Sequence, residues 1–267
     1  MIQIADYYDG ADQLTAHNKS PQYTRISPSS VANFFSSTRQ WYGETLLGEP
    51  GFEGSDSTIL GTIVHFFADL ASRRVRHPDP ALAVSTYLDH TNPTDRDEIL
   101  SLYRDMSNTL ISGCITGKPV PTLTEHFIFH QLLPGIYAAG TIDALIPLGD
   151  GTYSVRDYKT AATKPTGIPY HYRMQAHTYA YILTKLGYHI TQIELQYVIR
   201  PTKTLPCRHF EFTEPFTADD LDKIESQLLT VAHSIHHWNT HPEHRYLLAQ
   251  DFRLYTPPPK PSIFLKD

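Results

Sequence analysis

The strongest constraint on the fold is a pair of segments in which apolar residues recur at every second position. They cover residues 137–148, YAAGTIDALIPL, and residues 151–161, GTYSVRDYKTA. A period of two is typical of β-strands, because successive side chains of a strand point to opposite faces. The tripeptide Gly-Asp-Gly at 149–151 supplies a turn between them. We therefore predict a β-hairpin over residues 137–161.

The hairpin carries charged side chains where apolar ones are expected. Alternation puts Asp157 and Lys159 on one face of the second strand, and pairing with the first strand brings Asp143 alongside. Converging carboxylates are costly to desolvate unless a divalent cation lies between them. Mg²⁺ and Mn²⁺ accept such ligands, and a lysine beside the ion can orient or deprotonate an attacking water. The alternative is a surface ion pair between Asp143 and Lys159, worth at most about 1 kcal/mol.

Periodicity and capping residues predict helices and further strands around the hairpin. Ser27 and Pro28 begin one helix, residues 57–77 form a second, and further helices run to about residue 112. A strand at 122–133 precedes the hairpin. Three later elements are expected: a helix over 169–187 that ends at Gly187, a strand over 192–200, and a helix over 217–238 that begins with a capping box from Thr217 to Asp220. This order predicts an α/β fold with a mixed central β-sheet flanked by helices.

We expect a single domain over residues 25–256, preceded by an arm at 1–24 and followed by a proline-rich tail at 257–267. The two cysteines, Cys114 and Cys207, are too few for a disulfide framework or a four-cysteine metal site, which favours a reducing cytoplasm. The sequence has no apolar run of membrane-spanning length. We therefore expect a soluble protein with no membrane partner.

Basic residues are concentrated in one part of an acidic chain. The net charge is −6, yet residues 156–210 contain eight Lys and Arg against two Asp and Glu. One interpretation is a local phosphate-attracting surface beside the hairpin. The other is a chance scatter of surface lysines and arginines.

Four short motifs follow one another along these elements. They are Gly-x-x-x-His at 61–65, Gly-x-x-Asp at 140–143, Asp-x-Lys at 157–159 and Gln-x-x-x-Tyr at 175–179. Each is weak alone, but together, in this order on a helix, two strands and a helix, they resemble the PD-(D/E)XK nuclease superfamily. Within it they resemble the RecB-like branch, which includes CRISPR-associated exonucleases with iron–sulfur clusters. The resemblance covers roughly residues 25–200 and implies a restriction-endonuclease-like core.

The resemblance implies a role for each matching residue. His65 would supply a nitrogen ligand to a metal ion, which favours Mn²⁺ relative to Mg²⁺. Asp143 and Asp157 would be carboxylate ligands, and Lys159 the catalytic lysine. The other implied positions are the backbone carbonyl of Tyr158 as a further metal ligand, and Arg173, Gln175 and Tyr179 as residues that position the nucleic-acid strand. Glu125, on the strand before the hairpin, is expected either near the metal and substrate or at the exposed surface.

The sequence departs from the iron–sulfur members of that branch. Those proteins carry one cysteine near the N-terminal helix and three toward the C-terminus, whereas residues 34–42 contain none and only Cys207 lies in the C-terminal half. We expect no iron–sulfur cluster. Either packing alone holds the fold, or its N- and C-terminal parts meet through the helix at 217–238. His233 and His237 have a zinc-like spacing but lack an accompanying glutamate, and we expect them at the surface.

The expected function is metal-dependent hydrolysis of DNA phosphodiester bonds. The resemblance implies an exonuclease that acts on DNA ends in recombination, repair, or phage or mobile-element DNA processing. DNA would be its substrate, recombination or repair proteins its further partners, and the cytoplasm its location, that of the host if the protein is viral. Two alternatives stay open: a non-catalytic member that binds nucleic acid or protein, and a structure-specific endonuclease in a larger complex.

Overall fold

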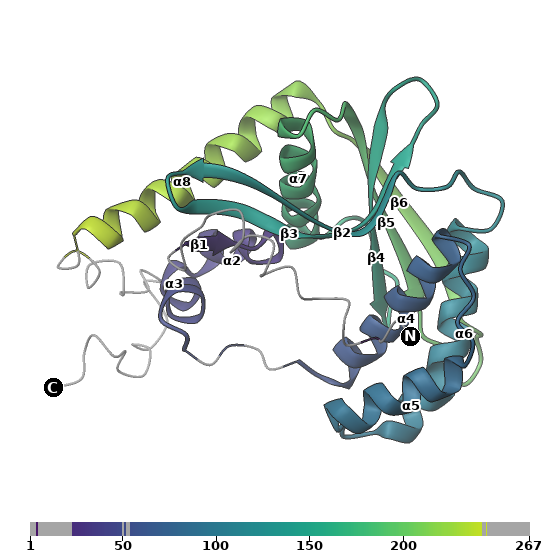
Figure 1. Ribbon diagram of the computed structural model, residues 1–267. Helices are drawn as coiled ribbons and strands as arrows, with labels where there is room; N and C mark the ends of the chain where they lie inside the picture. Colours follow the sequence, from purple (N-terminus) through teal and green to yellow (C-terminus); the bar gives the residue numbers. More distant parts are fainter. Residues whose placement is uncertain (1–3, 5–22, 50, 52–53, 242–243, 245–267) are drawn as a thin grey trace, which may run out of the picture.

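A computed structural model describes residues 4, 23–49, 51, 54–241 and 244 (Figure 1). Apart from Ile4, Tyr23 and Thr24, the predicted arm and tail lie outside these residues. The elements run in this order: β1 (Thr24–Ile26), η2 (Pro28–Ser30), α2 (Val31–Ser36), α3 (Thr38–Leu46), α4 (Asp56–Ser72), α5 (Pro80–Thr91), α6 (Arg96–Cys114), β2 (Leu123–Leu133), β3 (Ile136–Pro147), β4 (Tyr153–Ala161), α7 (Tyr170–Lys185), β5 (Ile190–Ile199), β6 (Arg208–Pro215) and α8 (Ala218–Thr240).

The six described strands form one mixed sheet, as the sequence predicts. β2 runs antiparallel along almost the whole of β3. On the opposite side of β3, β1 pairs in parallel with its beginning and β4 pairs antiparallel with its end. β5 follows in parallel with β4, and β6 completes the sheet antiparallel to β5. The parallel pair β4 and β5 is joined through α7, the kind of crossover that parallel strands require.

The predicted hairpin is confirmed as β3 and β4. Gly149 and Gly151 take positive φ angles of 95° and 84°, which a side chain would disfavour. Asp150 also shapes the turn, because its Oδ1 accepts the backbone N–H of Thr152 at 3.0 Å. The turn ends with the N–H of Leu148 donating to the carbonyl of Thr152 at 3.0 Å.

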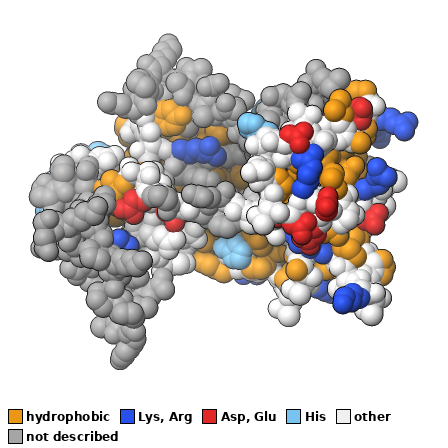
Figure 2. Space-filling view, turned by 90° about the horizontal axis from the view of Figure 1, so that it is seen from below, with side chains coloured by type: hydrophobic (Ala, Val, Ile, Leu, Met, Phe, Trp, Pro, Cys, Tyr) orange, Lys and Arg blue, Asp and Glu red, His pale blue; other side chains and the backbone are white. Residues whose placement is uncertain are grey.

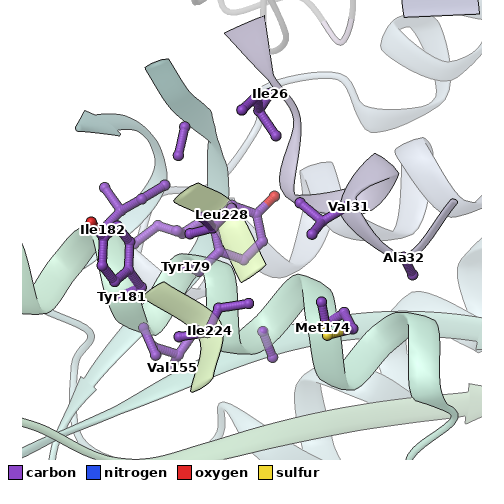
Figure 3. Close-up of a cluster of buried hydrophobic side chains, with 14 of the residues drawn as sticks. Ile26, Val31, Ala32, Val155, Met174, Tyr179, Tyr181, Ile182, Ile224 and Leu228 are labelled. Atoms are coloured by element: carbon purple, nitrogen blue, oxygen red, sulfur yellow. The ribbon is translucent and has the colours of Figure 1, made fainter. Parts of the chain in front are cut away.

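Helices cover both faces of the sheet, and alternation along β4 assigns its residues to two cores. Val155 packs in the larger core with α2, α3, α7 and α8, while Tyr158 packs in the second core with α4, α5 and α6. Figure 1 shows α7 and α8 on one side of the strands and α4 to α6 on the other. Figure 3 shows Met174 and Tyr179 of α7 meeting Val31 and Ala32 in the larger core.

The N- and C-terminal parts of the described chain meet through α8. Trp238, 1 % exposed, lies edge-on to Tyr42 of α3 at a ring-centroid distance of 4.9 Å and packs at 6.2 Å from Phe34 of α2. The predicted capping box from Thr217 to Asp220 begins this helix. Contact through α8 is therefore one way in which apolar packing joins the two parts, as the sequence allows.

Two sequence predictions needed correction. The helix expected to start at Ser27 begins as a 3₁₀ turn and is broken at Ser37, whose extended φ of −154° separates α2 from α3. Strand β6 was not predicted, although HFEF at 209–212 alternates, because the proline-containing segment before it resembles a loop. No helix in the described part of the chain combines the length and apolarity that membrane crossing requires.

Candidate active site

The site lies beside the part of β3 between its pairing with β1 and its pairing with β4. Pairing with β1 ends at Ala138, and pairing with β4 begins at Ala144. Gly140 stands in this interval because its neighbours leave no room for a side chain: a Cβ would lie 2.8 Å from Cδ of Pro28 and 3.1 Å from Cε1 of Tyr179. Gly140, the glycine of the Gly-x-x-Asp motif, thus lets η2 and α7 pack closely against β3.

Asp143 fills the point where the hairpin strands diverge. Its Oδ2 accepts the backbone N–H of Tyr158 at 2.5 Å, so a side chain takes the place of a ladder hydrogen bond. This contact holds the carboxylate against β4, as predicted from the hairpin. Because Asp143 is half-buried, its orientation is set by the strand and is not left to solvent.

His65 lies on α4, in the helix layer that packs against the sheet, and its side chain extends to Asp143. A Cβ at Gly61, one turn earlier, would lie 3.3 Å from Oγ1 of Thr160, so the glycine permits the close approach of α4 to β4. Nδ1 of His65 then lies 3.4 Å from Oδ1 of Asp143. The imidazole ring also packs edge-on against Tyr158, with centroids 5.8 Å apart. The first two motifs therefore meet in space.

Glu125 joins this pair through an unusual backbone conformation. Its φ is +40°, in the left-handed region that L-residues rarely adopt, and the register of β2 against β3 passes over it. Its carboxylate lies beside Asp143 and His65, and one ligand atom from each of the three falls within 4.8 Å of the others. Oε1 of Glu125 is shielded from solvent and has no hydrogen-bond partner among the described residues. Of the two predicted locations, the structure favours the one near the metal ligands.

Lys159 is held next to this group by three neighbours. Its Nζ lies 2.6 Å from Oδ2 of Asp157 and donates to Oε1 of Gln175 at 3.2 Å. The ammonium also lies 4.4 Å from the centre of the Tyr172 ring. Asp157 and Lys159 share a face of β4, as predicted, and the fourth motif contributes by positioning the lysine.

The electrostatics of His65 and Asp143 are those of an ion pair that is largely, though not fully, shielded from solvent. Burial opposes protonation of the imidazole, but the Asp143 carboxylate outweighs it and raises the pKa of His65 to about 9. Burial would raise the pKa of Asp143, yet the charges of His65 and Lys159 and the N–H of Tyr158 hold that pKa below its usual value. Without a metal ion, a proton on His65 neutralises Asp143.

The other carboxylates are held at higher pKa values. Burial raises the pKa of Asp157 to about 6, and Asp143 adds to this while Lys159 opposes it. Burial and the nearby charge of Asp143 raise the pKa of Glu125 well above the ordinary value. For Lys159, burial lowers the pKa, but Asp157 and Asp143 overcome it and raise that pKa. The raised pKa values of Asp157 and Glu125 reflect the cost of ionising three acids in so small a volume, a cost that a bound cation would lower.

These residues fit a divalent cation. One imidazole nitrogen and two carboxylates are ordinary ligands of such ions, and the oxygen of Glu125 without a donor is an acceptor that an ion would satisfy. The bound ion would act as a Lewis acid. Asp157 is not in that group of three, and its predicted ligand role stays a prediction. Lys159, which pairs with Asp157, can orient a water or balance charge on a phosphate. Tyr158 contributes its N–H to Asp143, and a ligand role for its carbonyl stays a prediction.

The structure does not bring Arg173 to this group. Positions two apart on a helix face different ways, so Arg173 points away from Gln175 and forms a bidentate pair with Glu214 of β6 at 2.6 and 2.7 Å. Tyr179 is only 7 % exposed and packs over Gly140, which leaves little surface for a nucleic-acid strand. Its contribution is to close the core beneath the site.

The expected basic surface is largely neutralised. Acids from inside and outside the basic block pair with its members: Arg156 with Glu194, Arg173 with Glu214, Lys185 with Glu225, and Arg200 with Glu98. What sequence reasoning missed is an aromatic row beside Lys159. Tyr172, Tyr197 and Phe212 follow one another at ring-centroid distances of 6.4 and 5.7 Å, and Lys164 lies 4.2 Å from the ring of Phe210. The alternation in the unpredicted strand β6 was the available signal.

Comparison with known proteins identifies the family. The model of the PD-(D/E)XK nuclease superfamily matches residues 25–246. The chain belongs to that superfamily. Members of the PD-(D/E)XK superfamily use divalent metals, in agreement with the group of His65, Glu125 and Asp143. A protein from Eubacterium rectale, provisionally named an exonuclease, has a similar fold, with 13 % identity, a TM-score of 0.53, and coverage of 89 % of this chain and 86 % of its own.

A second solved structure is the alkaline exonuclease LHK-Exo from Laribacter hongkongensis. It is 14 % identical, with a TM-score of 0.42, and the alignment covers 88 % of this chain and 98 % of its own. A search of curated proteins finds no match to this sequence. The RecB-like branch of the PD-(D/E)XK superfamily remains an interpretation of the four motifs, whereas the superfamily itself is shown.

Proposed function

We propose that this protein is a DNA exonuclease that uses Mg²⁺ or Mn²⁺ to hydrolyse phosphodiester bonds from strand ends. The observation that carries the proposal is the convergence of His65, Glu125 and Asp143 next to the Asp157 and Lys159 pair. The first group suits the ion, and Lys159 suits the water or the phosphoryl charge.

The partly exposed rings beside Lys159, Tyr172, Phe210 and Phe212, support nucleic acid as the substrate, while Tyr197 is buried and packs behind them. Lys159 on β4 pairs in register with Tyr197 on β5, which pairs with Phe210 on β6. Lys164 and Arg208 lie 4.2 and 5.7 Å from the ring of Phe210. Aromatic rings combined with cations are what a nucleic-acid strand uses for stacking and phosphate contacts. Strand ends are preferred because the protein from Eubacterium rectale with a similar fold is named as an exonuclease.

The test compares end-labelled linear DNA with covalently closed circular DNA of the same sequence, each with Mg²⁺ or Mn²⁺. We expect label release from linear DNA and no loss of the circle. Lys159→Ala should lower the rate by at least about 10²-fold, the usual cost of removing one preorganised charge-stabilising group. Lys223→Ala is the control, because Lys223 is 66 % exposed on α8 and pairs only with Asp219. Equal rates for Lys159→Ala and wild type would contradict this mechanism.

The same assay separates the alternatives. Nicking or linearisation of the circle would indicate an endonuclease, and DNA binding without hydrolysis would indicate a non-catalytic member. Parallel reactions with RNA test the choice of DNA. We place the activity in recombination, repair, or phage or mobile-element DNA processing in the cytoplasm, as the motif resemblance implies, with recombination or repair proteins as further partners.

A further inference from the structure

A cavity of about 510 Å³ lies between α4 and α6, on the opposite face of the sheet from α7. Phe67 and Tyr103 stack along one wall, with ring centroids 6.0 Å apart and an angle of 27° between the planes. Leu70, Val75 and Ile111 supply further apolar lining. This volume lies within the range of small-molecule sites. The right-hand side of Figure 2, where α4 to α6 lie, shows hydrophobic side chains exposed among both basic and acidic side chains.

The cavity has a buried donor with no acceptor. His77 lines it and is 7 % exposed. Nδ1 of His77 accepts the backbone N–H of Asp79 at 3.1 Å, so in the neutral ring the proton is on Nε2. The ring lies edge-on to Phe66 at 5.9 Å, which fixes its orientation. No described residue accepts a hydrogen bond from Nε2. A buried donor left in this state is costly, and a ligand acceptor would satisfy it.

A second buried polar group in the lining also lacks a hydrogen-bond partner. Ser107 of α6 is 4 % exposed, and its Oγ has no hydrogen-bond partner in the described chain. It lines the same cavity as His77. Both orphaned atoms belong to residues that line the cavity, and because most buried polar groups in proteins are hydrogen-bonded, a ligand could supply their missing partners.

The charged groups of the lining favour an anion. Arg76 and Arg104 are exposed, and within the described residues neither forms an ion pair. Asp79 is the acidic residue of the lining, but its Oδ1 accepts the N–H of Leu82 at 3.0 Å as the N-cap of α5. Its charge is therefore partly balanced by the start of that helix. Two unpaired guanidinium groups remain to attract a negative group.

This cavity is distinct from the candidate active site. Phe67 follows His65 by two residues and therefore lies on another side of α4. His65, Glu125, Asp143, Asp157 and Lys159 are all absent from the lining of the cavity. A ligand here would bind whether or not the proposed nuclease activity is correct.

We propose that the cavity binds a small organic anion with a flat apolar body, an aromatic phosphate or carboxylate. The ring would lie against Phe67 and Tyr103. The anionic group would accept hydrogen bonds from Nε2 of His77 and Oγ of Ser107, with Arg76 and Arg104 as counter-charges.

Isothermal titration calorimetry on the full chain, in buffer with EDTA, tests the proposal. The probes are phenyl phosphate, benzoate, deoxyadenosine 5′-phosphate, deoxyadenosine and inorganic phosphate. We expect saturable binding of at least one of the three aromatic anions, and binding at least tenfold weaker for deoxyadenosine and for inorganic phosphate. Deoxyadenosine lacks the negative charge, and inorganic phosphate lacks the aromatic ring.

Variants locate the site. Arg76→Gln and Arg104→Gln change exposed side chains, and each should weaken binding roughly tenfold by removing a charged partner. Ser107→Ala should weaken it as well. Arg74→Gln is the matched control, because Arg74 is exposed in the same loop and does not line the cavity. Unchanged circular dichroism spectra confirm folding of the variants.

Three results would overturn the proposal. The first is no binding of any aromatic anion to the wild-type protein. The second is that deoxyadenosine binds as tightly as deoxyadenosine 5′-phosphate, and that the affinities for phenyl phosphate and benzoate are the same in Arg76→Gln and Arg104→Gln as in the wild type. The third is binding that Lys159→Ala abolishes and the arginine variants leave intact, which would place the anion at the candidate active site.

Discussion

At the residue scale, glycines and one strained glutamate shape the site as much as the charged residues do. Gly61 and Gly140 let α4 and α7 approach the sheet, and the positive φ of Glu125 brings its carboxylate to His65. The sequence predicts His65, Asp143, Asp157 and Lys159 because their motifs have fixed spacings. The conformation of Glu125 could not be predicted, since a left-handed residue within a strand has no sequence signal unless it is glycine or asparagine.

Gly140→Ala should destabilise the protein by about 1–3 kcal/mol, the usual cost of adding a methyl group to a filled core. The new Cβ would lie 2.8 Å from Cδ of Pro28, whose ring cannot move freely. Urea unfolding followed by circular dichroism measures the change. Gly167→Ala is the control, because a Cβ there meets nothing within 4 Å and its φ is not positive. A stability of Gly140→Ala equal to that of wild type would show that the closure over β3 is looser than described.

His177 should make folding sensitive to acid. Burial lowers its pKa and Arg173 adds to this, while Asp220 and Glu214 act in the opposite direction. The unfolded chain therefore binds the proton more readily, so the stability that neutral His177 contributes is present above pH about 6.5 and is lost as the pH falls. The free energy of unfolding of His177→Gln should decrease less between pH 7 and pH 5 than that of wild type. Parallel urea titrations check this, and identical slopes against pH would refute it.

At the element scale, the strand that was not predicted explains why Arg173 lies away from the other site residues. Its partner Glu214 belongs to β6, so without that strand the arginine seemed available for nucleic acid. The same strand carries Phe212, one end of the aromatic row, and the nearby Phe210. The hairpin, α7, β5 and α8 were predictable because each has a clear period and recognisable ends. β6 was hidden by the proline-containing loop before it.

Helix α8 should be required for the N-terminal helices to stay docked. Trp238→Ala removes the ring that contacts Phe34 and Tyr42, and we expect a loss of about 3–5 kcal/mol. Asn239→Ala, an exposed neighbour on the same helix, is the control. Thermal melting compares them. A small effect of Trp238→Ala would mean that packing elsewhere holds α2 and α3.

At the scale of the whole molecule, folding pairs basic residues that are clustered in the sequence with acidic residues from other segments. The basic block at 156–210 is paired with acids such as Glu98 and Glu225, from regions far away in the sequence. Long-range pairing of this kind follows from topology, which periodicity does not determine. The predicted phosphate-attracting surface is therefore reduced to Lys164 and Arg208 around Phe210 and to the exposed Lys203.

Metal binding should stabilise the entire fold, because its ligands come from α4, β2 and β3 and meet only in the folded state. Mn²⁺ at one hundred times its Kd would add about 2.7 kcal/mol to the free energy of unfolding. Differential scanning calorimetry should show a rise in Tm that EDTA reverses. The rise should be smaller in Glu125→Gln and absent in Asp143→Asn. An equal rise in all three proteins would place the ion elsewhere.

The interval in β3 between its pairing with β1 and its pairing with β4 also bears on the order of folding. The first half of this strand joins the N-terminal segment to the sheet, and the second half joins the hairpin. A slip of one residue would turn Asp143 to the opposite face and misalign both halves together. Ligand geometry is therefore a reporter of correct strand pairing. In a refolding experiment, Mn²⁺ binding should recover in step with the native near-ultraviolet signal and not with early helix formation.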